Sequence, residues 1–252
     1  RPHPRAHPRP RPHSQPHAHP HPHPHPRPRP RPHSRSVTYT NVLNKSGCPS
    51  VTWVEARAGE LFPLFKTHKV TKTSEGLELS NEISKDAKNR LIKVLREYLK
   101  RINAENVDQT FITGTAVFRD ANNSDEVIEE IRKKLDLEIQ VISGQEEGYL
   151  TSLGVLSSKA INNDFFIVDI GGRSTELIYD SENRTNVHSL DLGVVSLTER
   201  ISNINPMGEA DRNEGDNLIQ QSLDLEIDTK NISMIGVSGT FTSIASIYLG
   251  QK

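Results

Sequence analysis

The sequence predicts an α/β protein, because segments typical of strands alternate with segments typical of amphipathic helices along most of its 252 residues,. The strongest helical pattern begins at Ser84, and the strongest strand pattern is the apolar run that ends at Val168, just before two consecutive glycines,. The chain has no run of about 18 apolar residues, so no segment is predicted to span a membrane,.

Residues 1–36 form a tail of unusual composition, with 8 of the 31 basic residues and none of the 32 acidic ones. Proline at nearly every second position excludes a helix or a central strand, and no hydrophobic residue could anchor the tail, so we expect disorder. Three interpretations stay open. The tail is an inert extension, a segment that binds a polyanion through its arginines, or a weak Zn²⁺ or Ni²⁺ site built from histidines.

The rest of the chain has 23 basic and 32 acidic residues, a formal charge of −9 that the tail hides in the total. Cys48 is the single cysteine, which excludes an intrachain disulfide and suits a reducing compartment,. The N-terminus lacks the apolar core of a secretory signal. We therefore expect a cytoplasmic protein.

The first elements after the tail are three strands and a helix. A weak strand pattern covers residues 37–43, and two stronger ones cover 51–54 and 60–66, with Ala58-Gly59 as the turn,. The helix that begins at Ser84 has one apolar stripe at three- and four-residue steps. Its members are Ala87, Leu91, Val94, Leu95, Tyr98, Leu99 and Ile102.

The pattern then continues as strand, helix, strand and helix. We expect a strand over 109–115, a helix capped by Ser124, and a strand over 137–142,. A helix that begins after Ser143 runs through Leu150 and Leu153. After the double glycine we expect a strand near 187–192, a helix from Val194, a helix over 213–225, a strand over 232–237 and a helix from Ser238.

The double glycine, Gly171-Gly172, joins two apolar strand patterns and predicts a hairpin rather than a strand that leads into a helix,. Glycines without a Cβ let main-chain amides converge around phosphate oxygens. Asp169 and Glu176 flank the turn with the oxygen ligands that Mg²⁺ prefers,. The turn therefore predicts a phosphate and metal site, although alone it is also typical of a plain hairpin.

Five stretches together resemble the exopolyphosphatase/guanosine pentaphosphate phosphohydrolase (Ppx/GppA) family, over roughly residues 47–250. They are Phe118-Arg119-Asp120-Ala121-Asn122-Asn123, Val141 to Glu147, Val168 to Glu176, Ser189 to Val195, and Gly236-Val237-Ser238-Gly239-Thr240. The resemblance implies the sugar kinase–Hsp70–actin (ribonuclease H-like) fold, with two domains around a cleft. We place the first α/β domain at 37–157 and a second, shortened at its C-terminus, at 158–252.

The resemblance also implies catalytic roles. Glu147 falls on the catalytic base that aims water at a terminal phosphorus, and Arg119 would contact the phosphoryl oxygens,. Plainer interpretations remain, since Glu147 is also typical of a solvated first helical turn and Arg119 of a surface ion pair. Asp120 and Asn123 are expected to brace the loop rather than touch substrate.

The same resemblance assigns the phosphate and metal ligands. Phosphate would be held by Gly171, Gly172, Arg173, Ser174 and Gly239, and Mg²⁺ by Asp169 and Glu176. The turn that contains Gly236, Gly239 and Thr240 would lie where related folds approach a nucleoside, or would only pack a strand on a helix.

Two positions depart from the family pattern. The first phosphate hairpin should lie at Lys45-Ser46-Gly47-Cys48-Pro49-Ser50, where Lys45 replaces an acidic residue and Pro49 removes a main-chain donor,. Arg173 stands where the family usually has glycine, which would cost about 1 kcal/mol or more if that position requires a positive φ.

The sequence therefore predicts an Mg²⁺-dependent enzyme that hydrolyses terminal phosphate from inorganic polyphosphate or guanosine pentaphosphate. The alternative is a catalytically weak polyphosphate-binding pseudoenzyme or a gene fragment, as the altered first hairpin indicates. A kinase of the same fold is a third and weaker interpretation. The oligomeric state stays open, with a homodimer among the options.

Overall fold

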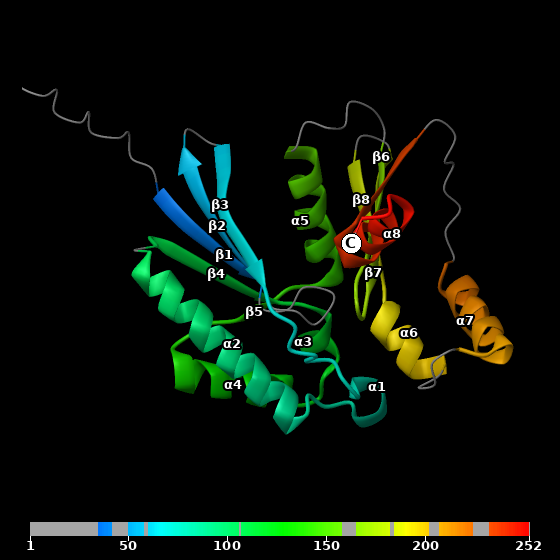
Figure 1. Cartoon of the computed structure of the whole chain (residues 1–252), viewed down its shortest axis with the longest axis horizontal. Coiled ribbons are helices and arrows are strands. Elements are labelled where there is room, and N and C mark those ends of the chain that lie inside the picture. The colour runs from blue at the N-terminus through cyan, green and yellow to red at the C-terminus, as the bar shows by residue number, and fades with distance from the viewer. Residues whose placement is uncertain are drawn as a thin grey trace, which may run out of the picture. The chain divides into compact units, whose positions relative to one another are not determined.

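The computed structural model describes residues 35–41, 50–57, 60–105, 107–157, 165–181, 184–201, 207–223 and 232–251. They fold into two β-sheets with helices (Figure 1), within one compact unit that spans His33–Lys252. The tail, apart from its last two residues, and the altered hairpin residues Lys45 to Pro49 lie outside the described residues, as do the two residues of the turn at Ala58-Gly59.

The first sheet has five strands in the order β3-β2-β1-β4-β5. Strands β1, β2 and β3 pair antiparallel, whereas β4 and β5 continue the sheet in parallel from β1. The strands are β1 (Arg35–Asn41), β2 (Ser50–Arg57), β3 (Glu60–His68), β4 (Gln109–Gly114) and β5 (Gln140–Val141). The helices that accompany this sheet are α1 (Leu77–Ser80), α2 (Lys85–Ala104), α3 (Ala116–Asp120) and α4 (Ser124–Leu135).

The second sheet has four strands in the order β8-β7-β6-β9. Strands β6, β7 and β8 pair antiparallel, and β9 is parallel to β6. The strands are β6 (Phe165–Ile170), β7 (Thr175–Ser181), β8 (Arg184–Leu190) and β9 (Ser233–Val237). The remaining helices are α5 (Gly144–Ser157), α6 (Val194–Ile201), α7 (Glu209–Ser222) and α8 (Ser238–Tyr248).

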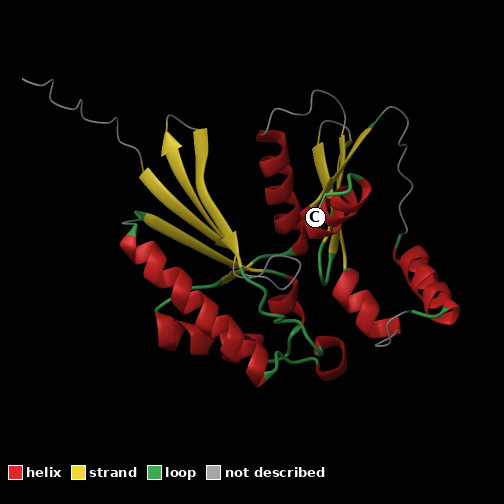
Figure 2. Cartoon of the chain, in the orientation of Figure 1, coloured by secondary structure: helices red, strands yellow, loops and turns green. Residues whose placement is uncertain are grey.

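Both sheets repeat one topology, which Figure 2 shows as two groups of strands. In each, the first strand lies inside the sheet, between its hairpin partner on one side and a parallel strand on the other. Residues 42–49, between β1 and β2, therefore occupy the same place in the strand order as residues 171–174 between β6 and β7.

Three hydrophobic clusters hold the fold together. The largest joins α2, α3, α4 and β4, and includes Leu91, Leu95, Ile112, Phe118 and Ile131. A second packs the C-terminal half of α2 on Val51 of β2. The third joins Phe165, Ile167 and Ile178 of the second sheet to Val155 of α5 and Val187 of β8. The helix stripe predicted from Ser84 is confirmed, because six of its seven members are buried.

Several predicted boundaries were wrong in detail. Strand β1 begins at Arg35, inside the stretch assigned to the tail. The strand predicted over 137–142 shrinks to Gln140–Val141, because only those residues pair with β4. The N-cap of α4 is Asn123 rather than Ser124. The amide side chain of Asn123 donates to the Ile83 carbonyl and accepts from its main-chain amide, so it braces the loop as expected.

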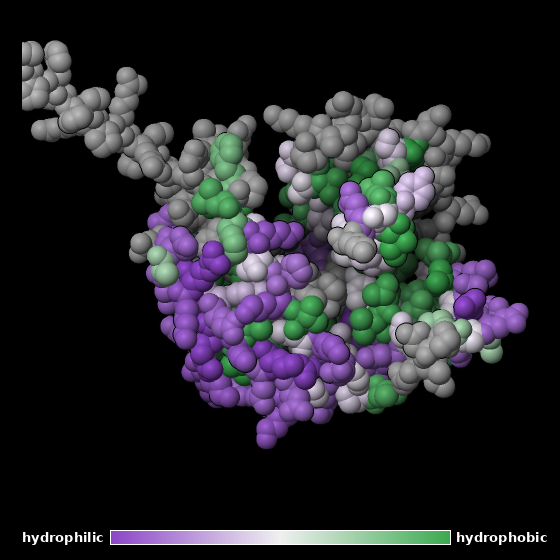
Figure 3. All heavy atoms as spheres, in the orientation of Figure 1, coloured by the Kyte–Doolittle hydropathy of each residue, from purple (hydrophilic) through white to green (hydrophobic). Residues whose placement is uncertain are grey.

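The surface differs between the two sheets. Hydrophilic side chains cover α2 and α4, whereas hydrophobic ones are exposed along α8 (Figure 3). The exposed apolar residues of α8 and the turn after it are Ile244, Ile247, Tyr248 and Leu249. Within the described residues, every helix is too short or too polar to cross a bilayer.

Candidate active site

The predicted glycine hairpin is present, with β6 and β7 paired antiparallel around residues 171–174. Asp169 lies directly opposite Glu176 in this pairing, and the two side chains are 5% and 0% exposed. Cross-strand partners point to the same face of a sheet. The two carboxylates therefore continue the buried face on which Ile167 and Ile178 form the core.

This carboxylate pair fits a magnesium ion. Two like charges that face each other in a buried site repel, and a divalent cation offsets that repulsion. The donors are oxygens only, and Mg²⁺ is commonly held by one or two carboxylates with water completing its shell. Among the described residues no three His, Cys, Asp or Glu side chains gather into a metal cage. The protein would therefore supply two carboxylate ligands.

The turn itself presents main-chain donors. The Gly171 amide donates to the Ser174 carbonyl at 3.0 Å and closes the hairpin. Within the described part of the chain, the amides of Gly172, Arg173 and Ser174 make no hydrogen bond, and the buried Ser174 hydroxyl also has no partner. Arg173 does not have a positive φ, so the strain considered for an arginine at this position is absent.

Helix α6 stabilises the turn through hydrogen bonds to its main-chain carbonyls. The amides of Val194, Val195 and Ser196 donate to the carbonyls of Gly171 and Gly172, so the first turn of α6 is used by the hairpin. A Cβ at Gly193 would lie 2.5 Å from the Arg173 main-chain nitrogen. Only glycine fits at that position without displacing the turn.

Helix α5 packs very closely on the second sheet, because its buried face carries small residues at Gly144, Gly148 and Ser152. A Cβ at Gly144 would lie 2.1 Å from the Ser189 hydroxyl, and one at Gly148 would lie 2.4 Å from Val187 Cγ1. Glu147 is the fourth member of this face and is 5% exposed. The close packing therefore brings Glu147 next to the hairpin.

The two adjacent glutamates of α5 have different surroundings. The exposed Glu146 accepts from the Ser143 amide at 2.8 Å, and the Ser143 hydroxyl accepts from the Glu146 amide at 3.1 Å. This reciprocal cap begins the helix. The Ser143 amide and hydroxyl lower the pKa of Glu146. Glu147 instead accepts from Arg119 Nη1 at 3.1 Å, in an ion pair whose side chains are largely buried.

Helix α3 connects α5 to the hairpin through two consecutive residues. Arg119 Nη1 also donates to the Ile142 carbonyl at 2.9 Å, just before α5. Asp120 accepts from Arg173 Nε at 2.7 Å. Arg119 thus forms an ion pair with Glu147, and the Arg173 side chain forms ion pairs with carboxylates. Asp120 therefore braces the hairpin turn through the Arg173 side chain, a partner that the sequence did not predict.

Two further polar residues at the carboxylate pair were missed in the sequence. The Thr151 hydroxyl donates to Asp169 Oδ2 at 3.4 Å, and the Ser189 hydroxyl donates to Glu176 Oε1 at 3.1 Å. Thr151 lies one helical turn after Glu147, so helical spacing could have identified it. Ser189 had no comparable signal, because it reaches Glu176 through the pairing of β7 and β8.

The later glycine turn lies beside the end of β6. The Thr240 hydroxyl donates to the Ile170 carbonyl at 3.0 Å. A Cβ at Gly236 would lie 2.2 Å from the Phe241 ring, so this glycine allows β9 to pack on α8. At Gly239 a Cβ would have nothing within 4 Å. The space beside Gly239 is therefore open, whereas that beside Gly236 is filled by Phe241.

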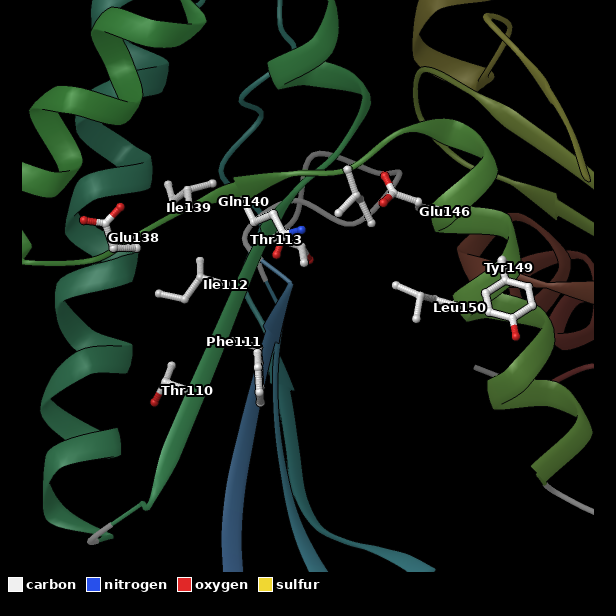
Figure 4. Close-up of a pocket in the computed structure, with 11 residues that line it drawn as sticks. Thr110, Phe111, Ile112, Thr113, Glu138, Ile139, Gln140, Glu146, Tyr149 and Leu150 are labelled. Carbon is white, nitrogen blue, oxygen red and sulfur yellow. The ribbon is translucent and has the colours of Figure 1, made fainter.

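A separate pocket of about 580 Å³ lies between β4, the segment around β5 and α5 (Figure 4). Phe111 and Thr113 face it from β4, and Tyr149 and Leu150 face it from α5. It contains none of the predicted site residues. Glu146 lines this pocket, whereas its neighbour Glu147 pairs with Arg119.

Comparison with known proteins gives a consistent result. The model of the Ppx/GppA phosphatase family matches residues 53–251. The fold resembles the Ppx/GppA enzyme of Aquifex aeolicus, with a TM-score of 0.68 and 24% identity over 86% of this chain and 72% of that one. It also resembles an exopolyphosphatase from Cytophaga hutchinsonii, with a TM-score of 0.75 and 23% identity over 86% and 70%.

A curated relative is the bifunctional 3-dehydroquinate synthase/phosphatase of Fusobacterium nucleatum, 28% identical over 194 residues. The match covers 73% of this chain and 29% of that protein. The chain thus spans less than a third of the length of this relative. The α/β architecture and the sugar kinase–Hsp70–actin fold predicted from the sequence are confirmed by the two solved structures.

Proposed function

Because the chain belongs to the Ppx/GppA phosphatase family, we propose that it is an Mg²⁺-dependent phosphohydrolase. It removes the terminal phosphate from inorganic polyphosphate or from guanosine pentaphosphate. The observation that supports this most strongly is the buried Glu147, held on a helix that packs directly on a hairpin with two buried carboxylates. Hydrolysis of a phosphoanhydride requires a base, a cation and donors for phosphate, and these residues supply each.

Glu147 acts as the general base. It accepts a proton from water while the water oxygen bonds to the terminal phosphorus and the bridging P–O bond breaks. The products are inorganic phosphate and a chain shorter by one phosphate. Arg119 donates to Glu147 and thereby fixes the direction of its carboxylate.

The hairpin binds the phosphate chain. The amides of Gly172, Arg173 and Ser174 donate to phosphate oxygens, as unpaired amides in a concave turn commonly do,. The carboxylates of Asp169 and Glu176 would hold Mg²⁺, which when bound neutralises phosphate charge. The Thr151 and Ser189 hydroxyls fix the orientation of those carboxylates.

The test is phosphate release from long-chain polyphosphate and, in parallel, from guanosine pentaphosphate, both with Mg²⁺. Glu147→Gln should reduce kcat by about 100-fold or more, as expected for loss of a general base. Glu146→Gln is the matched control, because glutamine keeps the helix cap and the residue lies outside the proposed site,. Equal activity of Glu147→Gln and the wild type would overturn the assignment of the base.

The second candidate is a phosphate-binding protein with weak catalysis, favoured by Lys45 and Pro49 in the segment equivalent to the first phosphate hairpin. It predicts measurable polyphosphate binding with no phosphate release by the wild type or by Glu147→Gln. Calorimetric binding measured beside the release assay separates the two candidates.

A further inference from the structure

The side chain of Arg173 is held by carboxylates from distant parts of the chain. Its Nε donates to Asp120 Oδ2 at 2.7 Å, and its Nη2 donates to Glu78 Oε1 at 2.8 Å. The Arg173 side chain is 7% exposed. The family resemblance predicts that Arg173 holds phosphate, but two of the three nitrogens of its guanidinium donate to carboxylates of the protein.

The carboxylate of Glu78 is itself held in place. The second carboxylate oxygen of Glu78 accepts from Arg200 Nε at 3.1 Å. The main-chain amide of Glu78 donates to Glu199 Oε2 at 3.3 Å. Glu199 also accepts from the Gly76 amide at 2.9 Å. Arg200 and Glu199 both belong to α6, so this helix fixes the segment around α1 that carries Glu78 (Figure 1).

These contacts form a ring that links α6, Glu78 and the hairpin turn. The first turn of α6 donates to the carbonyls of Gly171 and Gly172, and its last turn holds Glu78. Glu78 in turn binds Arg173, which follows Gly172. The hairpin turn is thus fixed through its main chain on one side and through the Arg173 side chain on the other.

The arrangement differs from that of a phosphate ligand. A side chain that binds substrate needs donors directed at the substrate, whereas Nε and Nη2 of Arg173 are engaged by two carboxylates. The third nitrogen, Nη1, is buried and has no partner among the described residues. The main-chain amide of Arg173 makes no hydrogen bond there either. The side chain and the amide therefore have separate roles.

We propose that Arg173 is a positioning residue, whose ion pairs with Glu78 and Asp120 fix the amides of the 171–174 turn in the orientation that binds phosphate. The proposal rests on the proposed phosphohydrolase function for its substrate. The part that concerns the rigidity of the turn stands on the contacts alone. Multiple charge-assisted contacts to one guanidinium fix its position more firmly than a single exposed pair.

The first experiment measures amide hydrogen exchange in the peptide that contains residues 171–176, without substrate. Glu78→Gln and Arg173→Gly should each speed exchange of the protected Gly171 amide, which donates to the Ser174 carbonyl and closes the turn, by 10-fold or more. The matched control is Glu75→Gln, because Glu75 lies in the same segment but pairs with Arg90 at 3.0 Å and does not contact the turn. If the exchange rate in Glu78→Gln equals that in the control variant, the proposal is overturned. Glu78→Gln keeps Arg173 and its ion pair with Asp120, so it still tests the proposal if Arg173→Gly fails to fold.

The second experiment measures KM and kcat for polyphosphate. A misaligned turn weakens binding in the ground and transition states alike, so KM should rise about 10-fold in Glu78→Gln with little change in kcat. A direct phosphate ligand predicts the opposite, since removing Glu78 would free the guanidinium and leave KM unchanged or lower. Arg173→Lys keeps a positive charge beside Glu78 and Asp120, so it should keep part of the binding of polyphosphate that arginine supports. If the wild type releases no phosphate, the proposed function fails, and the exchange data alone decide the role of Arg173.

Discussion

The close packing of α5 on the second sheet makes one substitution especially informative, Gly148→Ala. The new Cβ would lie 2.4 Å from Val187 Cγ1, whereas apolar carbon atoms normally meet at about 3.5–4 Å,. Either Val187 or the helix must therefore move by about 1 Å. Val187 is partly buried and packs against the core cluster of the second sheet, which limits how far it can move on that side.

The magnitude follows from two opposing effects. Overpacking a core site costs about 1–3 kcal/mol, and replacing a helical glycine by alanine contributes about 1 kcal/mol in favour of folding. We expect the free energy of unfolding to fall by up to about 2 kcal/mol. For a chain of this size that corresponds to a decrease in Tm of up to about 8 °C.

The same helix supplies the control. Gly154 also lies in α5, but a Cβ there would meet nothing within 4 Å. Gly154→Ala should therefore raise the stability by up to about 1 kcal/mol. Adding Val187→Ala to Gly148→Ala removes the clash, so the double variant should be more stable than the sum of the single effects by about 1 kcal/mol or more.

The assays are urea denaturation and phosphate release. Since Glu147 adjoins Gly148, a displacement of the helix by about 1 Å should reduce kcat/KM by about 100-fold, while Gly154→Ala retains activity. If Gly148→Ala were as stable and as active as Gly154→Ala, the close packing would not position Glu147, and the reasoning would fail.

Two further predictions concern backbone conformation and charge. Ser238 has a φ of +78°, which costs a non-glycine residue about 1–2 kcal/mol,. Ser238→Gly should therefore raise the free energy of unfolding, measured in urea, by about 0.5–1 kcal/mol, because the flexibility of glycine in the unfolded chain offsets part of the gain. A loss of stability in this variant would contradict the prediction. Lys134 and Lys88 lower the pKa of Glu130 to about 2. Because this folded-state pKa is below the ordinary value, the stabilisation is present above about pH 4.5 and disappears as the pH falls towards 2. Glu130→Gln should thus cost about 1 kcal/mol or less at pH 7 and progressively less below pH 4.5 in thermal unfolding, and an equal cost at pH 3 would refute the assignment.

The sequence predicts best those structural features that are formed by residues close together along the chain. The glycine hairpin is recognisable because both strands and the turn lie within residues 165–181, and the α2 helix because its apolar stripe repeats at a constant spacing. Asp169 and Glu176 become cross-strand partners as soon as the hairpin is assumed. The family resemblance added Glu147 and Arg119, which the structure joins in an ion pair.

Long-range partners could not be read from the sequence. Arg173 meets Asp120 and Glu78 from 53 and 95 positions away, so nothing local distinguishes a guanidinium held by protein from one that awaits a phosphate. The close packing of α5 was also hidden, because a helix with two glycines on its buried face has a weak pattern. Strand β5 was overestimated since its pairing partner, not its composition, limits its length.

The strand order of the second sheet anchors the glycine turn. Strands β1 and β6 are hydrogen-bonded on both sides, so neither is a sheet edge that frays or slips in register,. Strand β6 leads directly into the glycine turn at residues 171–174. During partial melting, the edge strands β3, β5, β8 and β9 should separate first, and the glycine turn should keep its anchor until the second sheet itself dissolves.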